Sequence, residues 1–67
     1  MANMIKELAS VRLKRELPDK RIPLGTRGGV VWVYTEPRIG YEVEFVDGEG
    51  ETLDVCTVEE ADIELVD

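Results

Sequence analysis

A run of five apolar residues with high β-propensity, Val30–Tyr34, directly follows three glycines within five residues. Strands that are apolar on both faces are usually covered on both faces in folded proteins. A chain of 67 residues forms one domain at most, and a domain of this length buries only about 60% of its unfolded surface. The second face of this strand must therefore be covered by the N-terminal segment, by a loop or by another molecule.

The glycine segment, Gly25–Gly29, has the composition of a phosphate-binding loop but not its context. Such loops lie between a strand and the N-terminus of a helix. Here a strand follows the glycines, so no helix N-terminus is offered to an anion. We therefore predict a tight turn, and a glycine bulge at Gly28 or Gly29 is compatible with it.

The other strands are predicted from the alternation of apolar and polar residues. They are Val11–Lys14, Tyr41–Val46, Thr52–Val58 and Ile63–Leu65. The side chains expected to point inward are Val11, Leu13, Tyr41, Val43, Phe45, Leu53, Val55 and Thr57. This assignment leaves Asp54 and Cys56 pointing outward.

The connections carry turn residues. Arg15–Leu24 contains two prolines and no apolar period, which predicts a long surface loop anchored by Leu17, Ile22 and Leu24. Asp47–Gly50 has the Asp-Gly signal of a hairpin.

Both ends of the chain suggest short helical features. Val58–Asp62 resembles a single helical turn, capped by Thr57 in a T-x-x-E spacing with Glu60. Near the N-terminus, Met4, Ile5 and Leu8 are spaced as the apolar side of a short helix or of an irregular arm that covers the barrel.

These elements predict a mostly β fold in one domain spanning residues 1–67. The expected architecture is a small SH3-like barrel of about five antiparallel strands. A short N-terminal helix or arm precedes the strands, and one helical turn comes before the last strand.

The most specific pattern in the chain is G-x-x-G-x-V-V at Gly25–Val31, followed about ten residues later by Y-E-V-E-F at Tyr41–Phe45 and a D-G turn. Together with Met4–Leu8, Val11–Leu13, Glu16–Pro18 and Asp62–Ile63, this pattern resembles the DUF4926 family of small bacterial and archaeal proteins. The resemblance covers nearly the whole chain. It implies an SH3-like or KOW-like barrel and transfers no functional residues.

The charge is strongly divided along the chain. Residues 1–40 hold all eight basic residues and four acidic ones, for a net charge of +4, whereas residues 41–67 hold eleven acidic residues and no basic one, for −11. The net charge of −7 opposes nonspecific binding to nucleic acid, which depends on neutralising phosphates. Because the acidic half alternates like strands, we expect acidic strands to lie beside basic ones and form cross-strand pairs.

Composition also argues against catalysis, a metal site and a cofactor, and we expect none of these. The chain has no histidine to activate Ser10, and Cys56 has only acidic neighbours, which raise a thiol pKa. One cysteine and no histidine exclude an ordinary zinc site. With no signal peptide and no apolar run of about 18 residues, the sequence predicts a cytoplasmic protein without a membrane span.

The preferred hypothesis is a non-catalytic protein-interaction module, acting as an accessory, antitoxin-like or immunity-like subunit or as a homo-oligomer. The candidate binding residues are Trp32, Tyr34, Arg12, Lys14 and Arg27. The alternative is KOW-like binding of nucleic acid or the ribosome. In that case the basic residues would contact the phosphate backbone of the nucleic acid, and the aromatic residues would stack on its bases. A third possibility is that the acidic half occupies the basic cleft of a partner.

Overall fold

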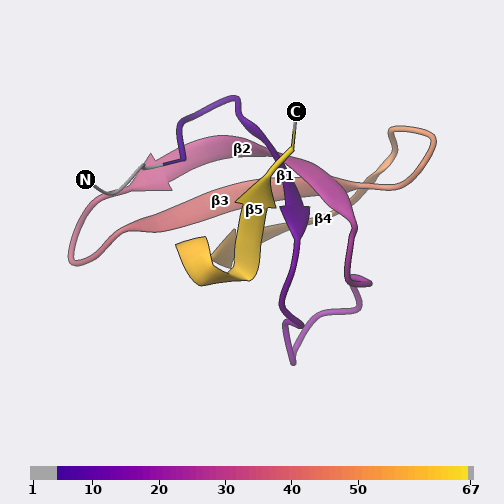
Figure 1. The fold of residues 1–67 in the computed structure, drawn as a ribbon, viewed down its shortest axis with the longest axis horizontal. Helices are drawn as coiled ribbons and strands as arrows, with labels where there is room; N and C mark the ends of the chain where they lie inside the picture. Colours follow the sequence, from indigo (N-terminus) through magenta and orange to yellow (C-terminus); the bar gives the residue numbers. More distant parts are fainter. Residues whose placement is uncertain (1–4, 67) are drawn as a thin grey trace.

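The computed structural model describes residues 5–66, which form one antiparallel sheet. The strands are β1 (Ser10–Leu13), β2 (Arg27–Tyr34), β3 (Gly40–Val46), β4 (Thr52–Val58) and β5 (Ile63–Leu65), with a 3-10 turn, η1 (Glu60–Asp62), before β5. Their order across the sheet is β4-β3-β2-β1-β5 (Figure 1). The predicted mostly β fold of five antiparallel strands with one helical turn before the last is confirmed. The sheet is open, because β4 and β5 each pair with one strand only within residues 5–66.

One face of the sheet carries the hydrophobic core, and the β1–β2 loop crosses it. The buried apolar residues are Ile5, Val11, Leu13, Ile22, Val30, Tyr41, Val43, Phe45, Cys56, Val58 and Ile63. From the loop, Ile22 is buried and Leu17 packs against the core, as predicted. Leu24 is 56% exposed, so its predicted role as an anchor is wrong. It lies at the turn beside Gly25, whose φ of +86° directs the chain into β2.

β2 begins at Arg27 rather than at Val30, so two of the glycines lie inside the strand. Gly28 pairs with Val11 of β1 and with Phe45 of β3. A Cβ atom on Gly28 would lie 2.5 Å from the carbonyl oxygen of Glu44. A glycine is therefore required here because the backbones of β2 and β3 approach closely.

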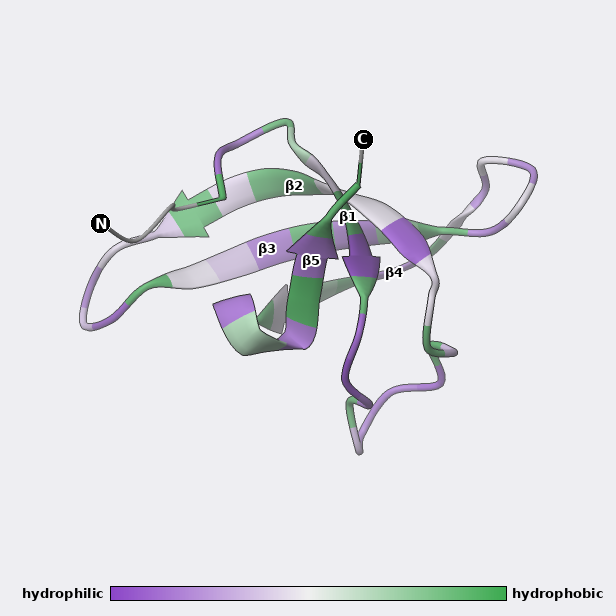
Figure 2. Cartoon of the chain, viewed as in Figure 1, coloured by the Kyte–Doolittle hydropathy of each residue, from purple (hydrophilic) through white to green (hydrophobic). Residues whose placement is uncertain are grey.

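The bulge in β2 is at Val31, not at Gly28 or Gly29. Val30 pairs with Val43, and the next paired residue is Trp32, opposite Glu42. The extra residue breaks the alternation of the strand. Val30 consequently faces the core, whereas both Val31 and Trp32 are exposed. The apolar positions along β2 are visible in Figure 2.

The facing of β4 is opposite to the one the sequence predicts. Cys56 and Val58 are buried, whereas Leu53 and Val55 are 48% and 43% exposed. Thr57, also predicted to point inward, is exposed. The cause is the register with β3: Cys56 pairs with Val43 and Val58 with Tyr41, and both partners face the core.

The η1 turn is held by Glu59 and Asp62 rather than by Thr57, which lies on β4. The backbone N–H of Glu59 donates to Oδ2 of Asp62 at 2.9 Å, and Nε of Arg15 donates to Oδ1 at 3.1 Å. The backbone N–H of Lys14 donates to the carbonyl oxygen of Asp62 at 2.8 Å. Asp62 thus ties the turn to the end of β1.

The N-terminal segment is an arm, not a helix, over the residues the structure describes. Ile5 is buried, and its N–H donates to the hydroxyl of Tyr41 at 3.3 Å. Leu8 is 89% exposed, so its predicted packing on the core is wrong. Its N–H instead donates to the carbonyl oxygen of Val30 at 2.7 Å, in a left-handed turn with φ of 70°. Met4, grouped with these residues in the prediction, lies outside the described range.

Replacing Leu8 with asparagine should stabilise the protein by about 0.5–1 kcal/mol. A left-handed conformation costs a leucine roughly 1 kcal/mol, and asparagine tolerates it better. The exposed leucine side chain contributes little packing. Chemical denaturation measures the change. Leu24→Asn is the matched control, because Leu24 is also exposed but has no positive φ. Equal effects of the two changes would contradict strain at Leu8.

Candidate binding face

The side of β2, β3 and β4 that points away from the core has no covering segment among residues 5–66. We call it the outer face, and its residues include Arg27, Val31, Trp32, Tyr34, Glu42, Glu44, Val55 and Thr57. Strand register orders these side chains in rows across the sheet. Trp32, Glu42 and Thr57 form one row, and Gly29, Glu44 and Val55 form the neighbouring row.

The aromatic residues of the outer face are accessible. Trp32 is 55% exposed, and Tyr34 is 40% exposed. Val31 and Val55 add two half-exposed aliphatic side chains. Single exposed apolar residues are common in proteins, but contiguous patches mark interaction sites. The prediction that Trp32 and Tyr34 share one side of β2 is therefore confirmed, and no other part of residues 5–66 covers that side.

Glu42 lies on β3 beside the two aromatic residues of β2 and is held in place by hydroxyl groups. Its Oε1 accepts a hydrogen bond from the hydroxyl of Tyr34 at 3.2 Å and another from Oγ1 of Thr57 at 2.6 Å. The negative charge of Glu42 is the main cause that raises the pKa of the Tyr34 hydroxyl. These two hydrogen bonds fix the orientation of the Glu42 carboxylate.

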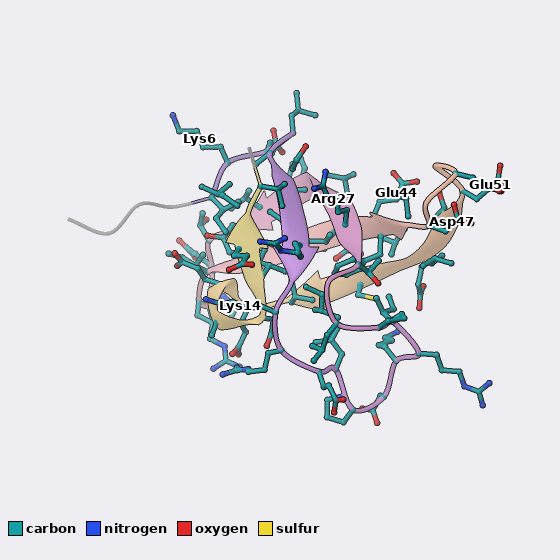
Figure 3. All side chains as sticks on the ribbon, turned by 45° about the vertical axis from the view of Figure 1, so that its right-hand side comes forward. Lys6, Lys14, Arg27, Glu44, Asp47 and Glu51 are labelled. Atoms are coloured by element: carbon teal, nitrogen blue, oxygen red, sulfur yellow. The ribbon has the colours of Figure 1, made fainter. Side chains whose placement is uncertain are left out.

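Acidic residues continue from Glu42 along β3 into the β3–β4 hairpin. Glu44 accepts a hydrogen bond from Oγ1 of Thr52. In the hairpin, Oδ1 of Asp47 accepts bonds from the N–H groups of Glu49 and Glu51 at 2.8 and 2.9 Å. Figure 3 shows Glu44, Asp47 and Glu51 toward the hairpin end of the molecule, with Lys6 and Lys14 on the other side.

Within residues 5–66, four ion pairs join the basic half of the chain to the acidic half. They are Arg12–Glu64 at 2.8 Å, Arg15–Asp62 at 3.1 Å, Lys20–Asp54 at 3.7 Å and Arg38–Glu59 at 3.4 Å. Only Arg12–Glu64 joins two strands, so the predicted cross-strand pairing is found at one place and the other three pairs involve loop residues. Within residues 5–66, none of these pairs uses an acid of β3 or of the β3–β4 hairpin. Those five acids, Glu42, Glu44, Asp47, Glu49 and Glu51, therefore keep their net negative charge.

The predicted basic site residues Arg12 and Arg27 lie on the same side of the sheet as the aromatic ones, but toward the other end of β2. Arg12 pairs in register with Arg27 on one side and with Glu64 on the other, so these three form a row across β2, β1 and β5. Arg12 is held by Glu64, and Lys14 is exposed beyond the end of β1. Sequence reasoning missed that Glu42 is the cross-strand neighbour of Trp32 and that Thr57 and Val55 lie on the same face one strand further on, because only the register between strands shows this.

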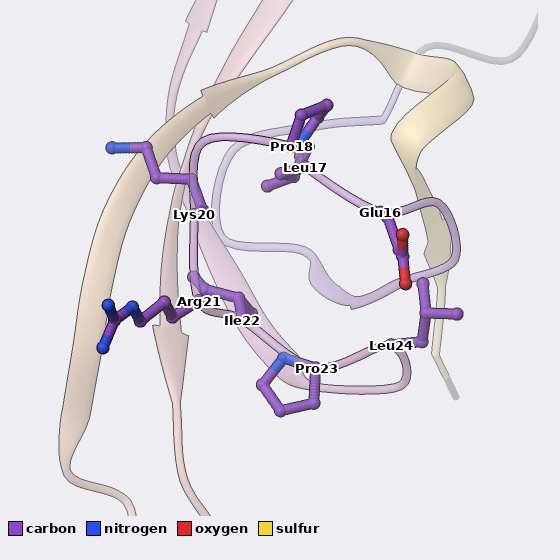
Figure 4. A pocket seen from close by; sticks show the side chains of 8 residues that line it. All are labelled: Glu16, Leu17, Pro18, Lys20, Arg21, Ile22, Pro23 and Leu24. Carbon is purple, nitrogen blue, oxygen red and sulfur yellow. The ribbon is translucent and has the colours of Figure 1, made fainter.

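Depressions flank the sheet within residues 5–66. One lies within the β1–β2 loop, lined by Glu16, Leu17, Pro18, Lys20, Arg21, Ile22, Pro23 and Leu24 (Figure 4). Another adjoins the outer face at Tyr34, Ile39 and Thr57. Among residues 5–66, no three potential metal-ligating side chains gather at one point. The described part of the chain also contains no helix long and apolar enough to cross a membrane.

The thiol of Cys56 is buried between the sheet and the loop. The pKa of Cys56 is raised, first by burial and then by the charge of Asp54. The folded state therefore holds the thiol proton more tightly than the unfolded state. This contribution to stability is fully present below the ordinary thiol pKa of about 8.5, and it is lost as pH rises through the higher pKa of the folded state.

We expect Cys56 to react with a thiol reagent at pH 8 roughly a thousandfold more slowly in the native protein than in urea. Only 2% of the residue is exposed, so labelling must await unfolding. Stopped-flow or manual labelling with a chromogenic disulfide measures both rates. Equal rates would mean that Cys56 points outward, as strict alternation along the strand predicts.

The topology defines a class: small, mostly β domains with five antiparallel strands, a long loop after the first strand and a 3-10 turn before the last. Within this class, the family model "Domain of unknown function (DUF4926)" matches residues 7–65. The chain therefore belongs to the DUF4926 family. No curated protein and no solved structure matches the chain.

Proposed function

We propose that this protein is a non-catalytic protein-interaction module that binds its partner through the outer face. The observation that carries the proposal is the exposure of Trp32 in a patch with Tyr34, Val31 and Val55. Burial of aromatic side chains dominates the energy of many protein interfaces. Within residues 5–66 this face has no cover, and a partner offers the apolar surface that would bury it.

We expect the protein to act as an accessory subunit of an antitoxin-like or immunity-like kind, because such a role suits a small domain and needs no catalytic groups. We place the protein in the cytoplasm, because a lone cysteine suits a reducing compartment. The KOW-like alternative is less well supported. Arg12 is neutralised by Glu64, and the aromatic residues needed for stacking lie beside Glu42, whose carboxylate repels phosphates. A gel-shift assay at low salt tests that alternative.

Photocrosslinking in cells tests the interaction proposal. A photoreactive phenylalanine analogue placed at Val31 should yield a discrete higher-mass adduct with another polypeptide. The same analogue at Glu16, in the loop on the opposite side of the sheet, should yield none. Equal adducts at both positions, or none at Val31, would contradict binding through the outer face.

Replacing Trp32 with alanine should change the free energy of unfolding of the isolated protein by less than about 1 kcal/mol. Truncation of a buried tryptophan costs about 3–5 kcal/mol, but this side chain is more than half exposed. Adduct formation from position 31 should nevertheless fall in the Trp32→Ala background. Urea denaturation and the crosslinking yield measure the two effects, and a large loss of stability would place Trp32 in the core instead.

A further inference from the structure

We propose that the occupant of the outer face is a basic segment of another protein, with an arginine or lysine side chain seated between the indole of Trp32 and the carboxylate of Glu42. This inference rests on the interaction function proposed above and names the chemistry of the partner. It is argued from the charge of the face and from the placement of these two residues.

The first step is the distribution of charge left after internal pairing. The four ion pairs take up Asp54, Glu59, Asp62 and Glu64, and all of these lie outside β3 and the β3–β4 hairpin. The five acids of β3 and its hairpin remain without a basic partner among residues 5–66. A partner surface that meets this region is attracted if it is basic and repelled if it is acidic.

The second step is the geometry around Glu42. Trp32 and Glu42 are a cross-strand pair on the outer face, so their Cβ atoms lie about 5 Å apart. A cationic side chain of the partner can contact the face of the indole and the carboxylate together. Cation–π attraction and an ion pair reinforce each other in that position. The hydrogen bonds from Tyr34 and Thr57 hold the Glu42 carboxylate in place. Val31 and Val55, on the same face, can pack against apolar residues of the partner segment.

The same features argue against two other occupants. A second copy of this chain, stacked on the outer face, would bring its own Glu42 and Glu44 against the same acidic surface, and such like-charge contacts are unfavourable. A nucleic acid would present phosphates to these carboxylates. The charge of the face therefore selects a basic polypeptide.

Selection from a displayed library of random 12-residue peptides tests the inference. The bait is the folded full-length protein, and binding is verified with the purified peptides by titration. We expect the enriched peptides to carry arginine or lysine beside an apolar residue. Their affinity should fall about thirtyfold for Trp32→Ala and about fivefold for Glu42→Gln, and it should weaken at high salt.

The variants distinguish a loss of affinity caused by a lost charge from one caused by a disturbed fold. Glu42→Gln keeps an oxygen that accepts from Tyr34 and Thr57 but removes the charge. Glu16→Gln, an exposed acid in the loop on the other side of the sheet, is the matched control and should leave affinity unchanged.

The outcomes are distinguishable. Peptides that depend on Trp32 but carry no basic residue would overturn the basic occupant and leave the interaction function standing. Self-association seen by sedimentation, and lost in Trp32→Ala, would identify a second copy as the occupant and overturn the inference. An absence of any peptide that depends on Trp32 would overturn the inference, and crosslinking from Val31 would then decide the proposed function separately.

Discussion

Gly28→Ala is expected to destabilise the protein by about 3 kcal/mol or more, enough to leave much of it unfolded at room temperature. A domain of this length has a total stability of only about 3–10 kcal/mol. The added methyl group would lie 2.5 Å from the Glu44 carbonyl oxygen and 2.9 Å from Cγ1 of Val43. The first of these atoms belongs to the backbone, so relief requires β2 and β3 to move apart.

Gly29→Ala is the control for this change. Gly29 is the next residue in the same strand, and a Cβ atom there meets nothing within 4 Å. Alanine also restricts the unfolded chain more than glycine does, so we expect no loss or a gain of up to about 1 kcal/mol. Thermal unfolding followed by circular dichroism measures both variants. Similar melting temperatures would contradict the close approach of β2 and β3 at Gly28.

Val58→Asp is expected to cost about 4 kcal/mol or more, because it places an unpaired carboxylate in the core. Val58 is buried and pairs with the fully buried Tyr41. An isolated charge in such a site is among the most destabilising single changes. Expression yield and urea denaturation report the effect, and we expect the variant to be largely unfolded.

Val55→Asp, three residues earlier on the same strand, is the matched control. Val55 lies on the outer face opposite Glu44, and 43% of it is exposed. Its replacement should cost about 1 kcal/mol, from lost β-propensity and repulsion by Glu44. If Val55→Asp proved the more damaging of the two, the facing of β4 would be the one that sequence alternation predicts.

The strands with one clear apolar face were predictable from the sequence. In β3, every second residue from Tyr41 to Phe45 is apolar and the intervening ones are acidic, so only one facing is possible. The last strand, Ile63–Leu65, was predicted with its observed bounds. The hairpin at Asp47–Gly50 followed from local turn chemistry, whereas the helical turn before β5 was predicted in the right place but with the wrong capping residue.

β4 was not predictable in the same way, because both of its faces carry apolar residues. Leu53 and Val55 compete with Cys56 and Val58 for the core, and local sequence favours neither set. Pairing with β3 decides the facing, with a register shift between Phe45 and Val46. Such a choice is made by tertiary contacts, which no local pattern encodes.

The candidate site was also only partly predictable from local sequence, because it depends on how the strands pair. Trp32 and Tyr34 were recognised from their place in an apolar run, but the single extra residue at Val31 turns Trp32 away from Val30 and out of the core. From the local sequence, Glu42 is predicted to be only a solvent-exposed glutamate on a strand. Its position between Trp32 and Thr57 arises from two strand registers, so the sequence pointed to the aromatic part of the face and not to its acidic centre.

The fluorescence of Trp32 tests the central claim most directly, because it is the only tryptophan in the chain. The folded protein alone should emit close to the wavelength of the urea-unfolded chain, since the indole is largely in water. Addition of a selected basic peptide should shift the emission to shorter wavelengths as the indole is covered. Emission already shifted in the free protein, or unchanged by a bound peptide, would contradict an open outer face that binds through Trp32.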